Sequence, residues 1–128
     1  MSASHWTPVC TLSEIPALGA RRMRRPDGVD IALFRTAGDR IYALLDRCPH
    51  KGGPLSQGIV FSESVACPLH NWTIRLDDGR AQAPDEGCTP AFAVKVDGEQ
   101  VYLRSDQLHA PIAEMHAAQC DGAACAEA

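Results

Sequence analysis

Two short segments, each joining one cysteine to one histidine, constrain the fold of this chain more than any other feature. Sixteen residues (51–66) separate these segments, which are Cys48-Pro49-His50 and Cys67-Pro68-Leu69-His70. Each segment offers one thiolate and one imidazole within a single tight turn, and both groups are common ligands of transition metals. The intervening residues are enough for a loop, one strand and a return, so we predict two loops that share one metal centre.

The same four donors suit two kinds of metal centre. Tetrahedral zinc is bound by sets of two cysteines and two histidines, and a [2Fe–2S] cluster can carry two histidines in place of two cysteines on one of its irons. Zinc fingers usually place their cysteines together on one segment and their histidines on another, whereas both segments here are mixed. We therefore predict the iron–sulfur cluster, with a zinc site or a metal-free interaction module as the alternatives.

This mixed ligand pattern resembles that of the Rieske proteins, which hold a [2Fe–2S] cluster between two such loops. The resemblance implies that Cys48 and Cys67 bind the inner iron, and that His50 and His70 bind the outer iron near the surface. Histidines in place of thiolates make the site less negative, which raises its reduction potential above that of an all-cysteine ferredoxin. Prolines stiffen both turns, and glycines let backbone N–H groups approach the sulfides. The residues expected around the cluster are Pro49, Gly52, Gly53, Pro68, Leu69 and Trp72.

Four positions depart from the Rieske proteins of respiratory chains. Those proteins carry an extra cysteine in each ligand loop, and the two form a disulfide; Gly53 and Leu69 occupy the matching positions here. They also place a serine and a tyrosine after the second histidine, where this chain has Trp72 and Ile74. Fewer hydroxyl donors to sulfur leave the reduced cluster less stabilised. We therefore predict a potential of about −150 mV, at the low end of the Rieske range.

Short apolar stretches separated by turn residues run through most of the chain. Alternating apolar residues and Asp-Gly turns predict strands at 6–10, 20–25, 29–35, 41–45, 64–66, 72–76, 92–96 and 100–104. We predict an all-β fold, a small Rieske-like antiparallel β-sandwich or barrel with the two cluster-binding loops at one end. This domain would cover residues 1–105. The Ala-rich remainder, 106–128, is predicted to be a partly disordered tail with one short helix near 112–119.

Charge and hydropathy exclude several classes of function. A net charge of −4 argues against nucleic acid as a partner. No apolar stretch approaches the roughly 20 residues that a membrane span needs. The one basic cluster, residues 21–25, is predicted to be a solvated strand and turn, with a docking patch for an acidic partner as the alternative.

The expected compartment decides how the cysteines are interpreted. We find no signal peptide in the sequence and expect a cytoplasmic chain, in which six cysteines do not imply a disulfide framework. Cys10 and Cys88 are expected to be packed or surface thiols. Cys120 and Cys125 are expected to be spare cysteines, with a second metal site as the minor alternative.

Three stretches, 48–60, 65–72 and 85–96, are similar to the small subunit of assimilatory NAD(P)H nitrite reductase. That resemblance implies a large partner subunit that carries FAD, a [4Fe–4S] cluster and sirohaem and reduces nitrite to ammonium. The chain would be the small subunit of that oxidoreductase, without an independent catalytic site, and would supply an electron relay, structural support or both. Rieske ferredoxins of aromatic-ring dioxygenase systems share the ligand motifs and are the alternative.

Overall fold

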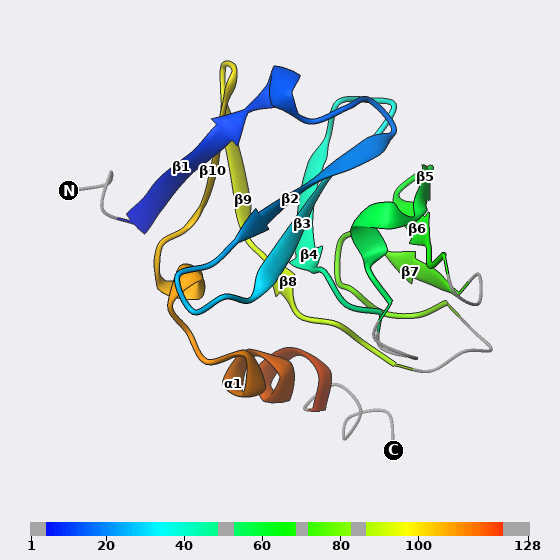
Figure 1. Ribbon diagram of the computed structural model, residues 1–128, viewed down its shortest axis with the longest axis vertical. Helices are drawn as coiled ribbons and strands as arrows, with labels where there is room; N and C mark the ends of the chain where they lie inside the picture. Colours follow the sequence, from blue (N-terminus) through cyan, green and yellow to red (C-terminus); the bar gives the residue numbers. More distant parts are fainter. Residues whose placement is uncertain (1–4, 49–52, 69–71, 83–86, 122–128) are drawn as a thin grey trace.

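The computed structural model describes residues 5–48, 53–68, 72–82 and 87–121 of the chain. Its strands form three antiparallel sheets (Figure 1). The first sheet has the order β1 (Trp6–Thr11), β10 (Gln100–Arg104) and β9 (Val94–Asp97). The second has the order β2 (Gly19–Arg24), β3 (Asp30–Arg35), β4 (Ile41–Leu45) and β8 (Ala91–Phe92). The third has the order β5 (Ile59–Phe61), β6 (Ser64–Ala66) and β7 (Thr73–Arg75).

The helices of the described residues are short. They are the 3-10 helices η2 (Leu12–Glu14), η3 (Leu55–Gln57) and η4 (Asp106–Leu108), the α-helix α1 (Ile112–His116) and the π-helical turn η5 (Ala117–Asp121). The predicted antiparallel all-β fold is therefore confirmed, and across the described residues the three sheets do not close into a barrel. No helix in the described ranges is long and apolar enough to span a membrane.

The second sheet is the shared wall of two apolar cores. Along β3, Ile31 and Leu33 point into the core that also contains residues of β1 and β10. Ala32 and Phe34 point the opposite way, into the core that contains residues of β5, β6 and β7. Because successive side chains of a strand face opposite sides, the continuous apolar run of β3 can serve both cores at once.

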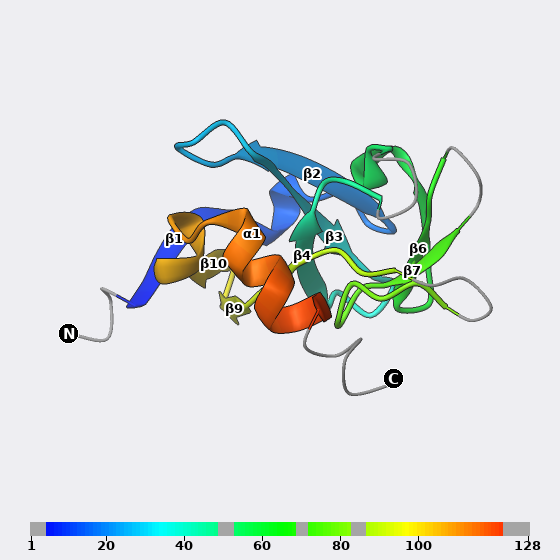
Figure 2. The ribbon, with the colours of Figure 1, turned by 90° about the horizontal axis from the view of Figure 1, so that it is seen from below.

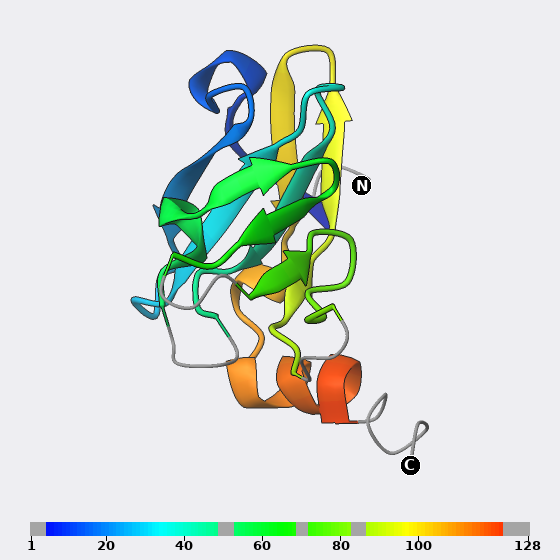
Figure 3. The ribbon, with the colours of Figure 1, turned by 90° about the vertical axis from the view of Figure 1, so that its right-hand side faces the viewer.

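The third sheet lies against the outer face of this wall. Figure 3 shows the small β5–β6–β7 sheet in front of β2, β3 and β4. Val60, Val65 and Ile74 come from its three strands and are buried in the same core as Phe34 of β3. This core therefore joins the strands that precede and follow the second predicted ligand loop to the body of the domain.

One predicted strand is divided between two sheets. The sequence pattern predicts a single strand over 92–96, but the structure interrupts it at Ala93. Residues before Ala93 pair with β4, and residues after it pair with β10. The Ala93 backbone N–H donates at 2.7 Å to the side-chain Oε1 of Gln107 instead of joining a strand ladder. The strand therefore breaks at the residue whose N–H bonds to Gln107, 14 positions further along the chain.

The basic cluster at residues 21–25 is less solvated than its composition predicts. The Arg25 side chain is only 1% exposed and forms an ion pair with Asp27 at 2.9 Å. The same guanidinium donates to the backbone carbonyls of Gln107 and Ala110 at 3.1 and 2.6 Å. The prediction of a wholly solvated strand and turn is thus wrong for Arg25, because these acceptors from the C-terminal segment cover it and satisfy its donors.

The C-terminal segment also corrects the expectation for two cysteines. Cys88 and Cys120 form a disulfide, so neither is the thiol or spare cysteine predicted above. Their sequence separation of 32 residues hid the pairing, since only the fold brings η5 beside the residues that precede β8 (Figure 2). The short helix predicted near 112–119 is present as α1 and η5. Cys125 lies outside the described residues.

Candidate metal centre

The first ligand loop begins where β4 ends. Cys48 is 1% exposed, and its backbone N–H donates to the carbonyl oxygen of Gly53 at 2.7 Å. This hydrogen bond joins the two described ends of the first ligand loop. The chain then enters η3, whose Leu55 is fully buried in the core behind the third sheet.

The second ligand loop connects β6 to β7 and is closed in the same way. Cys67 is 2% exposed, and its backbone N–H donates to the carbonyl oxygen of Trp72 at 2.7 Å. In both loops the cysteine therefore bonds to the fifth residue after it. The same hydrogen bond therefore joins the described ends of both loops, next to each cysteine.

The two cysteines belong to one apolar core. Cys48 and Cys67 both lie in the cluster that contains Leu55 and Val65. Gly58, just after η3, approaches the strand that leads into the second loop so closely that a Cβ atom there would overlap the carbonyl oxygen of Ala66. Glycine at this position therefore allows the return of the first loop to pack against the entry of the second.

A buried carboxylate fastens the base of the first loop. The Asp46 side chain is 1% exposed and accepts hydrogen bonds from the backbone N–H and the hydroxyl of Ser56, both at 2.7 Å. Arg22 of β2 donates to the same carboxylate through Nε at 2.8 Å. Three donors compensate the charge of a carboxylate withdrawn from water, since hydrogen bonds to an ionised acceptor are among the strong ones. We call Arg22, Asp46 and Ser56 the loop staple.

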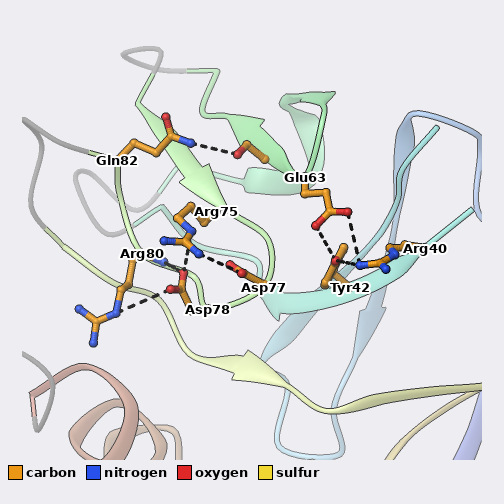
Figure 4. Close-up of polar contacts among 9 residues, drawn as sticks. Arg40, Tyr42, Glu63, Arg75, Asp77, Asp78, Arg80 and Gln82 are labelled. Atoms are coloured by element: carbon orange, nitrogen blue, oxygen red, sulfur yellow. Dashed lines mark hydrogen bonds and ion pairs between the residues drawn. The ribbon is translucent and has the colours of Figure 1, made fainter. Parts of the chain in front are cut away.

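The second loop rests mainly on backbone pairing. Val65 pairs with Ile74 and Ala66 with Thr73, so the β6–β7 ladder runs up to the loop. Gln82 adds a backbone hydrogen bond to the Thr73 carbonyl at 2.9 Å. Its side-chain amide donates to the Ser64 hydroxyl at 3.3 Å, a contact drawn in Figure 4.

A polar contact between sheets holds the third sheet against the second. The Tyr42 hydroxyl of β4 donates to Glu63, in the turn between β5 and β6, at 2.9 Å. Arg40 forms an ion pair with the same carboxylate at 3.5 Å (Figure 4). These exposed groups add orientation more than stability, because surface ion pairs contribute at most about 1 kcal/mol.

The described residues include two of the four predicted ligands, Cys48 and Cys67, and three of the residues predicted to surround the cluster. Gly53 is buried and Trp72 half-buried against the shared core, whereas Pro68 is exposed. The other predicted site residues lie outside the described ranges; they are Pro49, His50, Gly52, Leu69 and His70. Within the described part of the chain, no three His, Cys, Asp or Glu side chains are grouped to hold a metal ion. The four-ligand assignment therefore stays a prediction.

Sequence reasoning missed the loop staple. Asp46 lies two residues before Cys48, and Ser56 lies eight residues after it, which is a weak local signal. Arg22 is 24 positions from Asp46, and the sequence pattern predicts that it belongs to a solvated basic cluster. Only the pairing of β2 with β3, and of β3 with β4, brings this guanidinium to the loop.

Comparison with known proteins identifies the domain. A family model described as Rieske [2Fe-2S] domain matches residues 5–95. The 4beta-methylsterol monooxygenase of Methylococcus capsulatus is 40% identical over 72 residues, covering 56% of this chain and 19% of that protein. Ferredoxin CarAc of Metapseudomonas resinovorans is 29% identical over 103 residues, covering 80% of this chain and 95% of the ferredoxin. The nitrite reductase [NAD(P)H] large subunit of Klebsiella oxytoca is 36% identical over 111 residues, covering 80% of this chain and 11% of that subunit.

Solved structures fall into the same two groups. A chain from the complex of reduced oxygenase and oxidised ferredoxin in carbazole 1,9a-dioxygenase matches with a TM-score of 0.69 and 27% identity, covering 79% of this chain and 94% of that one. A protein described as a nitrite reductase NADPH small subunit also matches with a TM-score of 0.69 and 27% identity, covering 78% of this chain and 98% of that one. The present chain spans only about a fifth of the monooxygenase but most of the small proteins.

Proposed function

Because this chain belongs to the Rieske [2Fe–2S] family, whose cofactor is a Rieske-type cluster, we propose that it is the electron-transfer small subunit of an NAD(P)H-dependent assimilatory nitrite reductase. When bound, such a cluster accepts and donates one electron at a time. The observation that carries the proposal is the similarity over nearly the full length of a nitrite reductase small-subunit protein. The similarity to the Klebsiella oxytoca large subunit supports the same assignment.

We assign the cluster to four ligands: Cys48, His50, Cys67 and His70. The two cysteines support this assignment because both are buried thiols in one apolar core, and each backbone N–H donates to the carbonyl of the fifth residue after it. Two sulfur donors in such a setting suit the inner iron of a Rieske cluster. The histidines, which lie outside the described residues, are assigned to the outer iron through the family resemblance.

The protein around the proposed cluster has two tasks, orientation and exclusion of water. Leu55, Val65 and Ile74 are each fully buried around the two thiols and keep water from the inner side. Ile74 occupies a position where respiratory Rieske proteins have a hydroxyl donor, and it has none to offer. Since hydrogen bonds to the sulfurs stabilise the reduced cluster, we keep the prediction of a potential near the low end of the range, about −150 mV.

The partner we propose is a large nitrite reductase subunit that carries FAD, a [4Fe–4S] cluster and sirohaem. The Klebsiella oxytoca large subunit supports a lasting association, because the matching stretch there is part of the same polypeptide. In this arrangement the present chain has no independent catalytic site. We propose a cytoplasmic location, where NAD(P)H is available.

A second candidate function has its own support. Ferredoxin CarAc matches over 95% of its length, and the carbazole dioxygenase complex has the same TM-score as the nitrite reductase small-subunit protein. A ferredoxin of an aromatic-ring dioxygenase would use the same cluster and loops. It would meet its reductase and oxygenase only transiently.

Co-purification separates the two candidates. A tagged chain purified anaerobically from its own cells should bring down a large protein with sirohaem absorption, and the complex should oxidise NAD(P)H when nitrite is added. Transient reduction by a small flavin reductase, with no co-purifying sirohaem protein, would favour the dioxygenase ferredoxin instead. A colourless chain that contains zinc would contradict both.

Substitution of a proposed ligand tests the relay itself. His70→Leu should abolish the reduced-state EPR signal of the cluster and lower nitrite turnover, because the outer iron loses a ligand. His109→Leu is the matched control, since His109 is an exposed histidine outside the motifs. Unchanged nitrite turnover in His70→Leu would leave the chain a structural role only.

A further inference from the structure

The C-terminal strap, residues 105–121, lies outside the part of the chain that matches the family. The family match ends at residue 95, while the strap contains η4, α1 and η5. It crosses the lower end of the domain from the β2–β3 turn to β8 (Figures 1 and 2). The strap itself therefore lies beyond the matched residues, whereas the residues that hold it, Arg25, Cys88 and Ala91, lie within the match.

One end of the strap is held by a buried, non-covalent anchor. Arg25 donates to the carbonyls of Gln107 and Ala110, as described above. Leu108 and Met115 are each 7% exposed and pack into the core shared with β3 and β10. This end depends on apolar burial and on a satisfied guanidinium, neither of which responds to thiol reagents.

The other end is held by a disulfide bond and by the hydrogen bonds of one side-chain amide. Cys120 is joined to Cys88, and the Gln119 side chain pairs with the backbone of Ala91. Its Oε1 accepts from the Ala91 N–H at 2.7 Å, and its Nε2 donates to the Ala91 carbonyl at 2.9 Å. Among the described residues β8 has no neighbouring strand on this side, and the Gln119 side chain bonds to its backbone there.

An open pocket lies at the surface beside this end of the strap. It has a volume of about 430 Å³, and the strap contributes Gln107 and Gln119 to its lining. The opposite wall includes Asp77, Asp78 and Arg80, whose ion pairs are drawn in Figure 4. Gln119 lines this open pocket and is only half-buried, so less packing opposes its movement than opposes movement of the buried Leu108 and Met115.

The disulfide is connected to the second ligand loop through backbone pairing. Cys88 forms a β-bridge with Arg80, and Ala81 forms another with Ile74 of β7. The Gln82 N–H donates to the carbonyl of Thr73, the residue that follows Trp72 of the loop. Two backbone pairings therefore connect Cys88 to β7, the strand that follows the second ligand loop. A movement of Cys88 can be passed to β7 through them.

We propose that the Cys88–Cys120 disulfide is a second redox site, which exchanges with dithiol reductants and fastens or releases the Gln119 end of the strap. This inference rests on the proposed function, because a cytoplasmic partner of an NAD(P)H-dependent enzyme meets such reductants. Disulfides of mesophilic cytoplasmic proteins are usually transient and redox-sensing. With the bond reduced, Arg25 retains one end of the strap while the other end leaves Ala91.

The exchange balances as two successive displacements. A thiolate of the dithiol attacks one sulfur of the pair, forming a mixed disulfide and expelling the other cysteine as a thiolate. The second thiol of the reagent then displaces the remaining cysteine. The dithiol is oxidised to its disulfide by two electrons, and the two cysteines gain these electrons and two protons.

Peptide-resolved labelling tests the exchange on the holoprotein. The chain is incubated with or without dithiothreitol and then with N-ethylmaleimide, and the modified peptides are quantified by mass spectrometry. Cys88 and Cys120 should be unlabelled without reductant and labelled after it. No labelling at either cysteine after dithiothreitol, in a protein that stays folded, would overturn the proposal.

Hydrogen exchange tests the release of the strap. The Ala91 amide, which bonds to Gln119, should exchange about tenfold faster in the reduced protein because that end opens locally. The amides of β3 should not change. Cys120→Ser should exchange like the reduced protein without any reductant, and Cys10→Ser, at a buried cysteine outside the disulfide, should behave like the wild type. An unchanged Ala91 amide in Cys120→Ser would contradict the release.

Iron release tests the connection to the cluster. Transfer of iron to a chelator should be about tenfold faster from reduced wild type and from Cys120→Ser than from oxidised wild type, if local opening reaches β7. Dithiothreitol should not accelerate it further in Cys120→Ser. Equal release rates in all samples would overturn this connection. A chain without iron would refute the proposed function, while labelling and Ala91 exchange could still be read.

Discussion

The first ligand loop leaves β4 and returns through η3, whereas the second leaves β6 and returns directly into its paired neighbour β7. Both loops are closed by a hydrogen bond from the cysteine to the fifth residue after it. Below that bond they differ. The first loop is held by the side chains of Arg22, Asp46 and Ser56, and the second by a strand ladder.

This difference separates the loops by the kind of mutation that can damage them. A strand ladder is made of backbone groups, so most side-chain substitutions leave it in place. A buried carboxylate with three donors has no such redundancy, because its removal leaves the donors without an acceptor. We therefore expect the first loop to be sensitive to polar substitutions and the second loop to be tolerant of them.

The largest effect is expected from removal of the staple carboxylate. Asp46→Ala removes the charged acceptor of the part-buried N–H and hydroxyl of Ser56, whereas the Arg22 guanidinium, 44% exposed, can bond to water instead. The loss of two hydrogen bonds to a charged group should lower the free energy of unfolding by about 3 kcal/mol. Urea unfolding followed by circular dichroism measures this change. Asp106→Ala is the control, since Asp106 forms an exposed pair with Arg104 worth at most about 1 kcal/mol. Equal losses of unfolding free energy in the two variants would show that the loop staple contributes no more to stability than an exposed ion pair.

The contact between the loops is expected to give the next largest effect. In Gly58→Ala the new Cβ would overlap the Ala66 carbonyl oxygen, so the return of the first loop must move away from the strand that enters the second. We expect a loss of about 2 kcal/mol, typical of overpacking, and faster bleaching of the cluster absorption. Gly38→Ala, where a Cβ meets open space, is the matched control. A Gly58→Ala variant that unfolds like Gly38→Ala would remove the proposed contact.

A partial cut of the staple should have a smaller effect. Ser56→Ala removes the hydroxyl that donates to Asp46 but keeps the backbone N–H donor. The expected loss is about 1 kcal/mol, the ordinary value of one hydrogen bond, measured by urea unfolding. Ser13→Ala, at an exposed hydroxyl 3.3 Å from Thr11, serves as control. A loss as large as that of Asp46→Ala would mean that the hydroxyl, and not the carboxylate, organises the loop.

The smallest effect is expected at the second loop. Gln82→Ala removes the side-chain bond to Ser64 but keeps the backbone bond to Thr73 and the β6–β7 ladder. The loss of unfolding free energy should be about 0.5 kcal/mol. Comparison with Ser56→Ala in the same assay gives the contrast directly. If Gln82→Ala proves the more damaging of the two, the proposed difference between the loops is wrong.

The predicted positions of strands were most accurate where the local pattern is strong. The strand 41–45 has the predicted bounds, and the last hairpin turns at Gly98, whose φ of +63° suits glycine. Pro8 predicted an edge strand, and β1 is at the edge of its sheet. The break at Ala93 has no local signal, since the Ala93 N–H bonds there to Gln107, a residue of the strap.

The sequence by itself determined the family, the two loops and the all-β class, because ligand spacing, period-two patterning and turn residues are all local. Only the tertiary structure decided that Asp46 is buried beneath Arg22, that Arg25 holds the strap, and that Cys88 meets Cys120. Each of these contacts joins residues far apart in the chain. Their energies come from desolvation and covalent closure across sheets, which no local pattern of residues specifies.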